Sequence, residues 1–409
     1  MNIKKFIQNV YHPRGGLVSH LRKIDVKPGL PQIIRYLAVI NSNRLRGGMI
    51  TGSGFSIDHT SSKMAAIGEA VERYCANIEN QKTVLGSYEE FEGYAMDPMK
   101  ITRLTDEQYS RNPNLNKVTT KSILEWCNGV DLISGETVLI PKELIYLTNN
   151  QKPIRDIIST GLACSDTKED AISRGLLECI ERDAFVLFWM LGIVNFKIDF
   201  TDINNQDICK LISLAKHSDL QIELYDISQE FSVTTILSVI RKKDVKGFYL
   251  GCAAHYQYSK AILNSIKEGL GGYSVFYEYL NYYDFNYPSK MEEIETLDDH
   301  ALYYISGQAD WVLEGLLPST LPIKLANELL DKQTTLDITL DKLNEQEYIP
   351  YAVDLTTIDV KSIGLNVMRV VVPALAFLPV GEPMLNCPRL HQKKALSNKE
   401  FNLLPHPFP

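Results

Sequence analysis

The chain lacks the short motifs that mark several common classes of protein. Its seven cysteines include no C-x-x-C pair and are irregularly spaced, which argues against a zinc ribbon or a disulfide framework. Its eight histidines include no H-x-x-x-H pair, the spacing of many helical metal sites. No G-x-x-x-x-G-K-[ST] loop is present either, so any nucleotide must be held without a P-loop.

Targeting signals and long apolar runs are also missing. The longest apolar run, AFVLFWMLGIV at 184–194, is too short to cross a bilayer and is typical of a buried helix. The opening MNIKKFIQNVYHPRGG has no apolar signal-peptide core. The net charge of −8 argues against nucleic acid or an anionic membrane as the main partner. Because several cysteines lie among apolar residues, we expect a reducing compartment, the cytoplasm.

What the chain does contain is typical of a large globular protein. Its 409 residues are 45% hydrophobic and 22% charged, and no low-complexity linker divides them, so we expect a single large domain over 1–409. Short β-branched segments alternate with helical patterns, which predicts an α+β fold with mixed sheets packed against helices. The expected strands are 136–141, 221–227, 233–240, 247–255 and 368–375, and the expected helices are 61–80, 167–190, 259–270 and 322–345.

One pattern occurs twice. Glu-x-x-Glu-Arg starts at Glu69 and again at Glu178, each time inside an apolar helical stretch that follows a glycine-containing segment. A third stretch, 251–272, has the same layout and keeps Glu268, but Gly271 stands where the second glutamate would be. Two good copies and one eroded copy predict an internal pseudo-repeat that is too weak to indicate a solenoid.

The paired glutamates raise a question of charge. Residues three apart share a helix face, so each pair repels itself and requires compensation where it is buried. In one interpretation the glutamates are exposed, or pair with Arg73 and Arg182. In the other, four carboxylates hold Mg²⁺ and the arginines face the phosphates of ATP, because Mg²⁺ prefers oxygen ligands and guanidinium groups fit phosphate. The duplication inside apolar helices favours the second.

Several stretches resemble one known family. AAIGEAVERYC and STGLACSDTKEDAISRGLLECIERDAF are similar to two helices of the YcaO-domain proteins, and DDHALYY and VDLTTIDVKSIGLNVMRVVVPALAFLP are similar to their C-terminal half. The ending PHPFP resembles the Pro-x-Pro-x-Pro tail of the azoline-forming cyclodehydratases, the D proteins of ribosomal peptide natural-product pathways. The resemblance runs from about residue 10 to the end and implies a YcaO-like fold.

The resemblance also implies an activity. Such proteins use ATP and Mg²⁺ to convert Cys, Ser or Thr of a precursor peptide into thiazoline or oxazoline, by phosphorylating the amide oxygen after the side chain attacks. Pro409, at the end of a tail (405–409) placed in the active site, would act in catalysis. Mg²⁺ and the nucleotide would be held by Glu69, Glu72, Glu178 and Glu181, and the phosphates would contact Arg73, Arg182 and Arg389.

The departures from the family pattern leave an alternative open. Ala65 stands where Ser is frequent, Ser53 where Lys is common, Gly271 where the third helix has Gln, and Lys393 where the last motif has Glu. A non-catalytic scaffold or peptide-docking subunit is therefore the second hypothesis, and a thioamide- or amidine-forming YcaO enzyme is a variant of the first.

Partners are implied by the same resemblance. We expect a separate E1-like or leader-binding C protein, since no clamp domain fits the sequence, with residues 1 to about 50 a candidate partner-contacting segment. A flavin-dependent dehydrogenase is a further candidate partner, and a homodimer is left open.

Overall fold

The computed structural model describes residues 3–45, 47–148, 152–283 and 286–408. Its helices are α1 (Ile3–Val10), α2 (His59–Ala76), α3 (Asp106–Arg111), α4 (Lys168–Leu191), α5 (Gln206–Lys216), α6 (Tyr258–Tyr282), α7 (Leu297–Ile305), α8 (Asp310–Leu316), α9 (Leu336–Glu345), α10 (Ile358–Ser362) and α11 (Pro388–Ser397). Its strands are β1 (His20–Ile24), β2 (Ile34–Asn41), β3 (Met49–Ser56), β4 (Thr83–Gly86), β5 (Leu124–Asp131), β6 (Thr137–Pro141), β7 (Leu162–Ser165), β8 (Phe196–Asp199), β9 (Leu220–Asp226), β10 (Thr234–Lys242), β11 (Tyr249–His255), β12 (Ile323–Leu325), β13 (Tyr351–Asp354) and β14 (Asn366–Val371).

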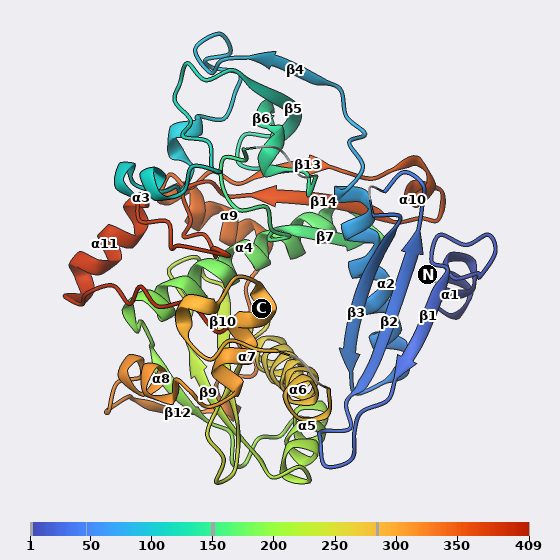
Figure 1. Ribbon diagram of the computed structural model, residues 1–409, viewed down its shortest axis with the longest axis vertical. Coiled ribbons are helices and arrows are strands. Elements are labelled where there is room, and N and C mark those ends of the chain that lie inside the picture. The colour runs from blue at the N-terminus through green and yellow to red at the C-terminus, as the bar shows by residue number, and fades with distance from the viewer. Residues whose placement is uncertain (1–2, 46, 149–151, 284–285, 409) are drawn as a thin grey trace.

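The described strands form three sheets that surround the buried helix α4 (Figure 1). The first has the order β1-β2-β3, the second β11-β10-β9-β8-β12, and the third β4-β5-β13-β14-β7, with β6 added beside β5. Pairing is antiparallel except between β12 and β8, which run parallel. The α+β class with mixed sheets is therefore confirmed.

The pseudo-repeat expected from the sequence is a repeated strand–helix unit. Strands β3, β7 and β11 each belong to a different sheet, and each is followed by a helix that begins three residues after the strand ends. Glu69, Glu178 and Glu268 are each the eleventh residue of their helix. The second glutamates, Glu72 and Glu181, are each the fourteenth. The three units therefore place their acidic residues at equivalent positions.

A close approach of backbones fixes how each helix lies on its strand. Gly52, Gly161 and Gly251 each stand seven residues before their helix. A Cβ on each would meet the twelfth residue of that helix, at 2.2 Å from the Ala70 nitrogen, 2.9 Å from the Cys179 sulfur and 2.5 Å from the Gly269 nitrogen. Only glycine allows such contact. The helix residue that each glycine meets directly follows the first glutamate of its unit. The close contact therefore sets the distance of that glutamate from the strand.

The units close in a ring. Helix α2 contacts β7 as well as β3, α4 contacts β11 as well as β7, and α6 contacts β3 as well as β11. Where α6 meets β3, the fourteenth residue of α6 is Gly271, and a Cβ there would lie 2.7 Å from the Phe55 ring. The glycine that replaces the expected side chain thus makes room for the aromatic ring of the first unit.

The expected elements agree with the structure except in one segment. The expected strands coincide with β6, β9, β10, β11 and β14, and the first three expected helices with α2, α4 and α6, although α6 continues to Tyr282. The helix expected at 322–345 is wrong in its first half. Ile323–Leu325 is strand β12 beside β8, and a helix begins only at Leu336, where the Thr335 hydroxyl accepts the Ile338 N–H. Pro322 and the pair Thr334–Thr335 favour this division.

Candidate nucleotide site between the repeated helices

Backbone N–H groups hold each acidic helix at its own strand. The Glu69 carboxylate accepts the Ser53 N–H at 2.5 Å and the Ser53 hydroxyl at 3.0 Å. The Glu178 carboxylate accepts the Gly161 N–H at 3.0 Å. Each bond keeps one oxygen at the strand and leaves the rest of the carboxylate for other contacts.

The second glutamates reach across the unit borders. Glu72, on α2, accepts the Cys164 N–H of β7 at 2.7 Å, and Glu181, on α4, accepts the Ala254 N–H of β11 at 2.8 Å. Cys164 and Ala254 occupy equivalent positions, each four residues before its helix. The carboxylates therefore line the two seams where successive units meet.

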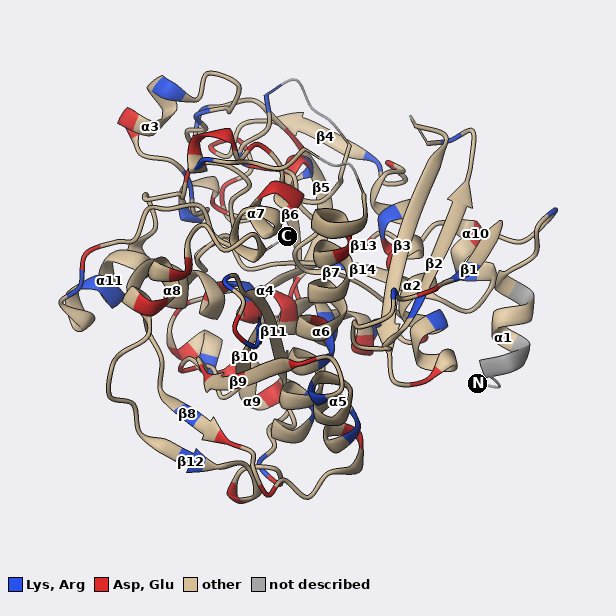
Figure 2. Cartoon of the chain, turned by 60° about the horizontal axis from the view of Figure 1, so that its bottom comes forward, with Lys and Arg blue, Asp and Glu red and all other residues tan. Residues whose placement is uncertain are grey.

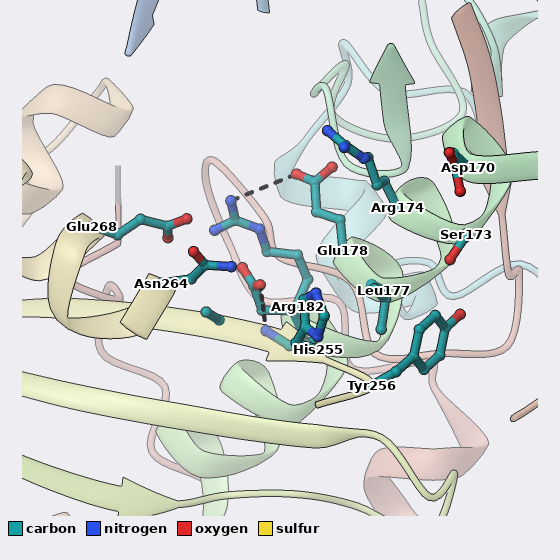
Figure 3. A pocket seen from close by; sticks show the side chains of 13 residues that line it. Asp170, Ser173, Arg174, Leu177, Glu178, Arg182, His255, Tyr256, Asn264 and Glu268 are labelled. Carbon is teal, nitrogen blue, oxygen red and sulfur yellow. Dashed lines mark hydrogen bonds and ion pairs between the residues drawn. The ribbon is translucent and has the colours of Figure 1, made fainter. Parts of the chain in front are cut away.

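A cavity opens at each seam. The α2 cavity, of about 690 Å³, is lined by Ser53, Ala65, Glu69, Glu72 and Cys164 among others. The α4–α6 cavity, of about 610 Å³, is lined by Glu178, Glu181, Arg182, His255 and Glu268 among others (Figure 3). Arg174 lines both, so one guanidinium group stands at the boundary between them.

Burial makes the carboxylates hard to ionise. It raises the pKa of Glu72 to about 8, with further contributions from the charges of Glu178 and Glu69. It raises the pKa of Glu181 well above its usual range, helped by Glu268, and it raises the pKa of Glu268 to about 7. The pKa of Glu178 is raised for the same reason. Acidic residues gather where α4, α6 and β11 come together (Figure 2), and full ionisation of the cluster would give it more negative charge than its cations balance.

The two arginines of the repeated motif lie in different surroundings. Arg73 pairs with Glu69 at 2.6 Å and is half-exposed. Arg182 extends between Glu178 and Glu268 (Figure 3), and its Nη2 is 3.6 Å from a Glu178 oxygen. Burial opposes its charge, but Glu181, Glu178 and Glu268 outweigh that and raise its pKa. Its Nε and Nη1 are buried and have no hydrogen-bond partner within the described residues.

Arg389 is not brought to these cavities. Its side chain is completely buried, and its Nε and Nη2 each donate to Asp183 at 2.7 Å. Its Nη1 donates to Glu230 at 2.6 Å, and the Phe231 and Tyr348 rings face the guanidinium group. The geometry gives this residue a role in attaching α11 to α4. Arg389 lines neither cavity, so the predicted contact between Arg389 and a phosphate is not seen in this geometry. Pro409, the other terminal prediction, lies outside the described residues.

Three cavity residues were outside the predicted site. Arg174 and Asn264 are each the seventh residue of their helix, the position that Ala65 holds in α2. The sequence placed Glu268 in the third, incomplete copy of the repeat but predicted no role for it. Aligning the three units by the helix start would have placed all of them beside the glutamates.

The fold and the site now allow a comparison with known proteins. A family model described as YcaO cyclodehydratase, ATP- and Mg²⁺-binding, matches residues 53–376, most of the chain and all three acidic helices. The chain belongs to the YcaO family.

Two curated proteins are similar to this chain and carry no stated activity. An uncharacterized protein of Methanothermobacter thermautotrophicus is 25% identical over 390 residues, which covers 89% of each chain. An uncharacterized protein from the tfuA 3′ region of Rhizobium leguminosarum bv. trifolii is 26% identical over 231 residues, 53% of each.

Solved structures share the fold. A heterocyclase in complex with substrate and cofactor matches with a TM-score of 0.80 and 21% identity, over 100% of this chain and 57% of the heterocyclase chain. This chain therefore spans little more than half of that protein. YcaO from Methanopyrus kandleri bound with AMPPCP and Mg²⁺ matches at 0.62 and 16% identity, over 99% and 93%. The E. coli microcin synthetase McbBCD complex matches at 0.64 and 17%, over 90% and 91%.

The donor set of this YcaO chain fits Mg²⁺ and a polyphosphate. Its partly buried carboxylates outnumber the cations beside them and so favour a bound cation, and the unpartnered nitrogens of Arg182 favour anionic oxygens. The described residues contain no preformed group of three metal-ligating side chains. Mg²⁺ commonly takes one or two carboxylates and completes its shell with water and phosphate. Glu69 and Glu72 would serve from the α2 cavity, and Glu178 and Glu181 from the α4–α6 cavity.

The departures from the family pattern have structural counterparts. The Ser53 hydroxyl bonds Glu69, so it supports the first carboxylate. Ala65 is exposed in the α2 cavity, and Lys393 pairs with Glu230 at 2.7 Å, beside Arg389. Within the described residues, no helix is long and apolar enough to span a bilayer.

Proposed function

We propose that this chain is an ATP-dependent cyclodehydratase that converts Cys, Ser or Thr residues of a precursor peptide into thiazoline or oxazoline. The observation that carries the proposal is the ring of acidic helices, whose carboxylates line two adjoining cavities, with Arg182 and its two unpartnered nitrogens at the α4–α6 cavity. The likeness to a heterocyclase in complex with substrate and cofactor supports it. The Pro-x-Pro-x-Pro ending favours azoline formation over other YcaO chemistry.

The residues of the chain have separable roles in this reaction. Bound ATP would supply the phosphoryl group that turns the amide oxygen into a leaving group. The glutamates would hold Mg²⁺, and Arg73, Arg174 and Arg182 would neutralise phosphate charge from fixed positions, which is most of what phosphoryl transfer requires of a protein.

His255 contributes a donor to the same cavity. Its Nδ1 accepts the Gln257 N–H at 2.9 Å, and burial lowers its pKa, so the neutral ring carries its proton on Nε2. A neutral donor at the wall of the α4–α6 cavity suits a phosphate oxygen or the developing oxyanion.

Partners complete the proposal. The substrate would be presented by a separate leader-binding protein, because leader binding raises the effective concentration of the core peptide. A dehydrogenase would act later, on the azoline. Residues 1 to about 50 would contact a partner.

The test is reconstitution with the precursor peptide, the leader-binding partner, Mg²⁺ and ATP. We expect loss of one water mass per ring together with phosphate release, and slow or absent processing without the partner. Hydrolysis of ATP with exchange of oxygen for sulfur or nitrogen would assign thioamide or amidine formation instead. No peptide-dependent hydrolysis in the complete system would assign a docking or scaffold role.

A further inference from the structure

The residues just before the C-terminus are attached to the protein through their backbone. The Trp189 indole N–H donates to the Leu404 carbonyl at 2.8 Å, and the Tyr304 hydroxyl donates to the Pro405 carbonyl. Both donors are buried, Trp189 on α4 and Tyr304 on α7. The tail therefore runs along α4 in one fixed register.

The imidazole of His406 then fixes the next residues. Burial lowers the pKa of His406 to about 3, so the ring is neutral. Its Nε2 is 2.7 Å from the Pro379 carbonyl and its Nδ1 accepts the Phe408 N–H at 3.2 Å, which requires the proton on Nε2. The His300 ring stacks on it at 4.4 Å between centroids. The His406 ring is thus fixed through Nε2 at Pro379, and its Nδ1 sets the backbone of Phe408.

Phe408 places its ring against Arg182, the arginine of the site that has two unpartnered nitrogens. The ring is buried, lies 4.7 Å from that of Phe185, and faces Arg182, whose guanidinium carbon is 4.3 Å from the ring centroid. An aromatic face attracts the positive charge of a guanidinium group, and this attraction does not require an N–H hydrogen bond. The Phe408 ring therefore covers one face of the Arg182 guanidinium group, whose Nε and Nη1 are buried and have no hydrogen-bond partner within the described residues.

We propose that Phe408 is a positioning residue for nucleotide binding: its ring holds Arg182 in the orientation that receives a phosphate, and so couples the docked tail to the nucleotide site. This inference rests on the proposed nucleotide site and goes beyond it, because it gives the tail a role in nucleotide affinity. The alternative is that Phe408 only fills space against Phe185.

The experiment is titration of the full-length protein with a non-hydrolysable ATP analogue and Mg²⁺. Phe408→Leu keeps an apolar side chain and loses the ring face, whereas Phe408→Tyr keeps the face. Phe401→Leu is the matched control, because Phe401 lies in the same segment and its ring faces Lys394, at 4.9 Å, away from both cavities. We expect Phe408→Leu to weaken binding roughly two- to thirtyfold, the range of one such interaction, and the other two variants to stay within about twofold of the parent.

A graded substitution separates electrostatics from packing. Replacing Phe408 with mono-, di- and trifluorinated phenylalanine weakens the negative ring face at nearly constant size, and we expect affinity to fall stepwise with no matching fall in the midpoint of thermal unfolding. In an Arg182→Ala background the fluorine series should lose its effect. Flat affinity across the series, or an equal effect in the Arg182→Ala background, would overturn the proposal. Absence of Mg²⁺-dependent binding by the parent would overturn the nucleotide site itself.

Discussion

At the scale of single residues, the site is defined by carboxylates that the ligand-free protein accommodates at a cost. Glu72 and Glu181 are each anchored by one backbone N–H, and burial raises the pKa of both. Positions that are unfavourable for stability and lie together in a cavity are expected where function requires them. Two predictions follow from this.

The first concerns Glu181. Glu181→Gln keeps the shape and removes the charge that would hold Mg²⁺, so we expect peptide-dependent ATP turnover to fall by about a hundredfold or more, since one well-placed electrostatic group contributes that much. The fold should survive, as measured by circular dichroism and thermal unfolding. Glu169→Gln, on the exposed first turn of the same helix, is the control and should stay within a few-fold. Near-normal turnover by the Glu181→Gln variant would show that Glu181 is not a ligand of Mg²⁺.

The second concerns pH and Glu72. Its pKa is about 8 in the folded protein and near 4.5 in the unfolded chain, so between these values the folded state binds more protons and stability falls as pH rises. Replacing Glu72 with Gln removes this pH-dependent loss of stability. We expect the ligand-free variant to gain roughly 1–3 kcal/mol over the parent at pH 8 and little at pH 5, because a one-unit shift corresponds to about 1.4 kcal/mol and the group is only partly shielded from water.

The measurement is denaturant unfolding of both proteins from pH 5 to 9. A difference between them that does not grow with pH would show that Glu72 is ionised in the ligand-free protein. Mg²⁺ with nucleotide should stabilise the parent more at pH 8 than at pH 6, since binding requires the deprotonated carboxylate.

At the scale of elements, the helices α2 and α6 are set by backbone contact with their strands. Gly251 of β11 is the clearest case, because a Cβ there would lie 2.3 Å from the Ser265 carbonyl oxygen and 2.5 Å from the Gly269 nitrogen. These are backbone atoms, which cannot turn away as a side chain would. Helix α6 carries Glu268 and Asn264, so its distance from β11 shapes the α4–α6 cavity.

We therefore expect Gly251→Ala to push α6 away from β11. The free energy of unfolding should fall by about 1–3 kcal/mol, the range of overpacked sites, and nucleotide affinity should fall with it. Gly315→Ala is the matched control, since Gly315 lies in helix α8 with open space around its Cβ position. The control should be neutral or slightly stabilising. Equal stability of Gly251→Ala and the parent would mean that the strand and helix can separate at no cost.

At the scale of the whole molecule, the C-terminal end of the described chain packs against α4. Arg389 bonds Asp183, and Phe408 lies on Phe185 and Arg182, so the C-terminal segment packs directly against the helix that carries two of the site glutamates. A change beyond the last residue can therefore reach the chemistry.

The corresponding prediction is that appended residues after Pro409 impair ring formation. Each adds roughly 3 Å of extended chain, whereas catalytic geometry tolerates about 0.5 Å. We expect a C-terminally tagged protein to form azolines orders of magnitude more slowly than an N-terminally tagged one, as measured by the loss of one water mass per ring, while the fold is retained. Equal rates would exclude a role for the terminus and favour a YcaO chemistry other than azoline formation.

The sequence alone determined the class of fold, the three acidic helices, five of the described strands, and the paired glutamates. These were accessible because helical spacing, β-branched runs and the repeated Glu-x-x-Glu-Arg are local patterns. The segment 322–345 was misjudged because the pairing of Ile323–Leu325 with β8 depends on a strand more than a hundred residues away.

Only the tertiary structure decided which residues meet. It placed Arg174 between two cavities and turned Arg389 into the core, although both are simply arginines on helices in the sequence. It also brought Phe408 onto Arg182. Such contacts join distant segments through packing, and packing is specified by the whole chain at once, so no local pattern reports them.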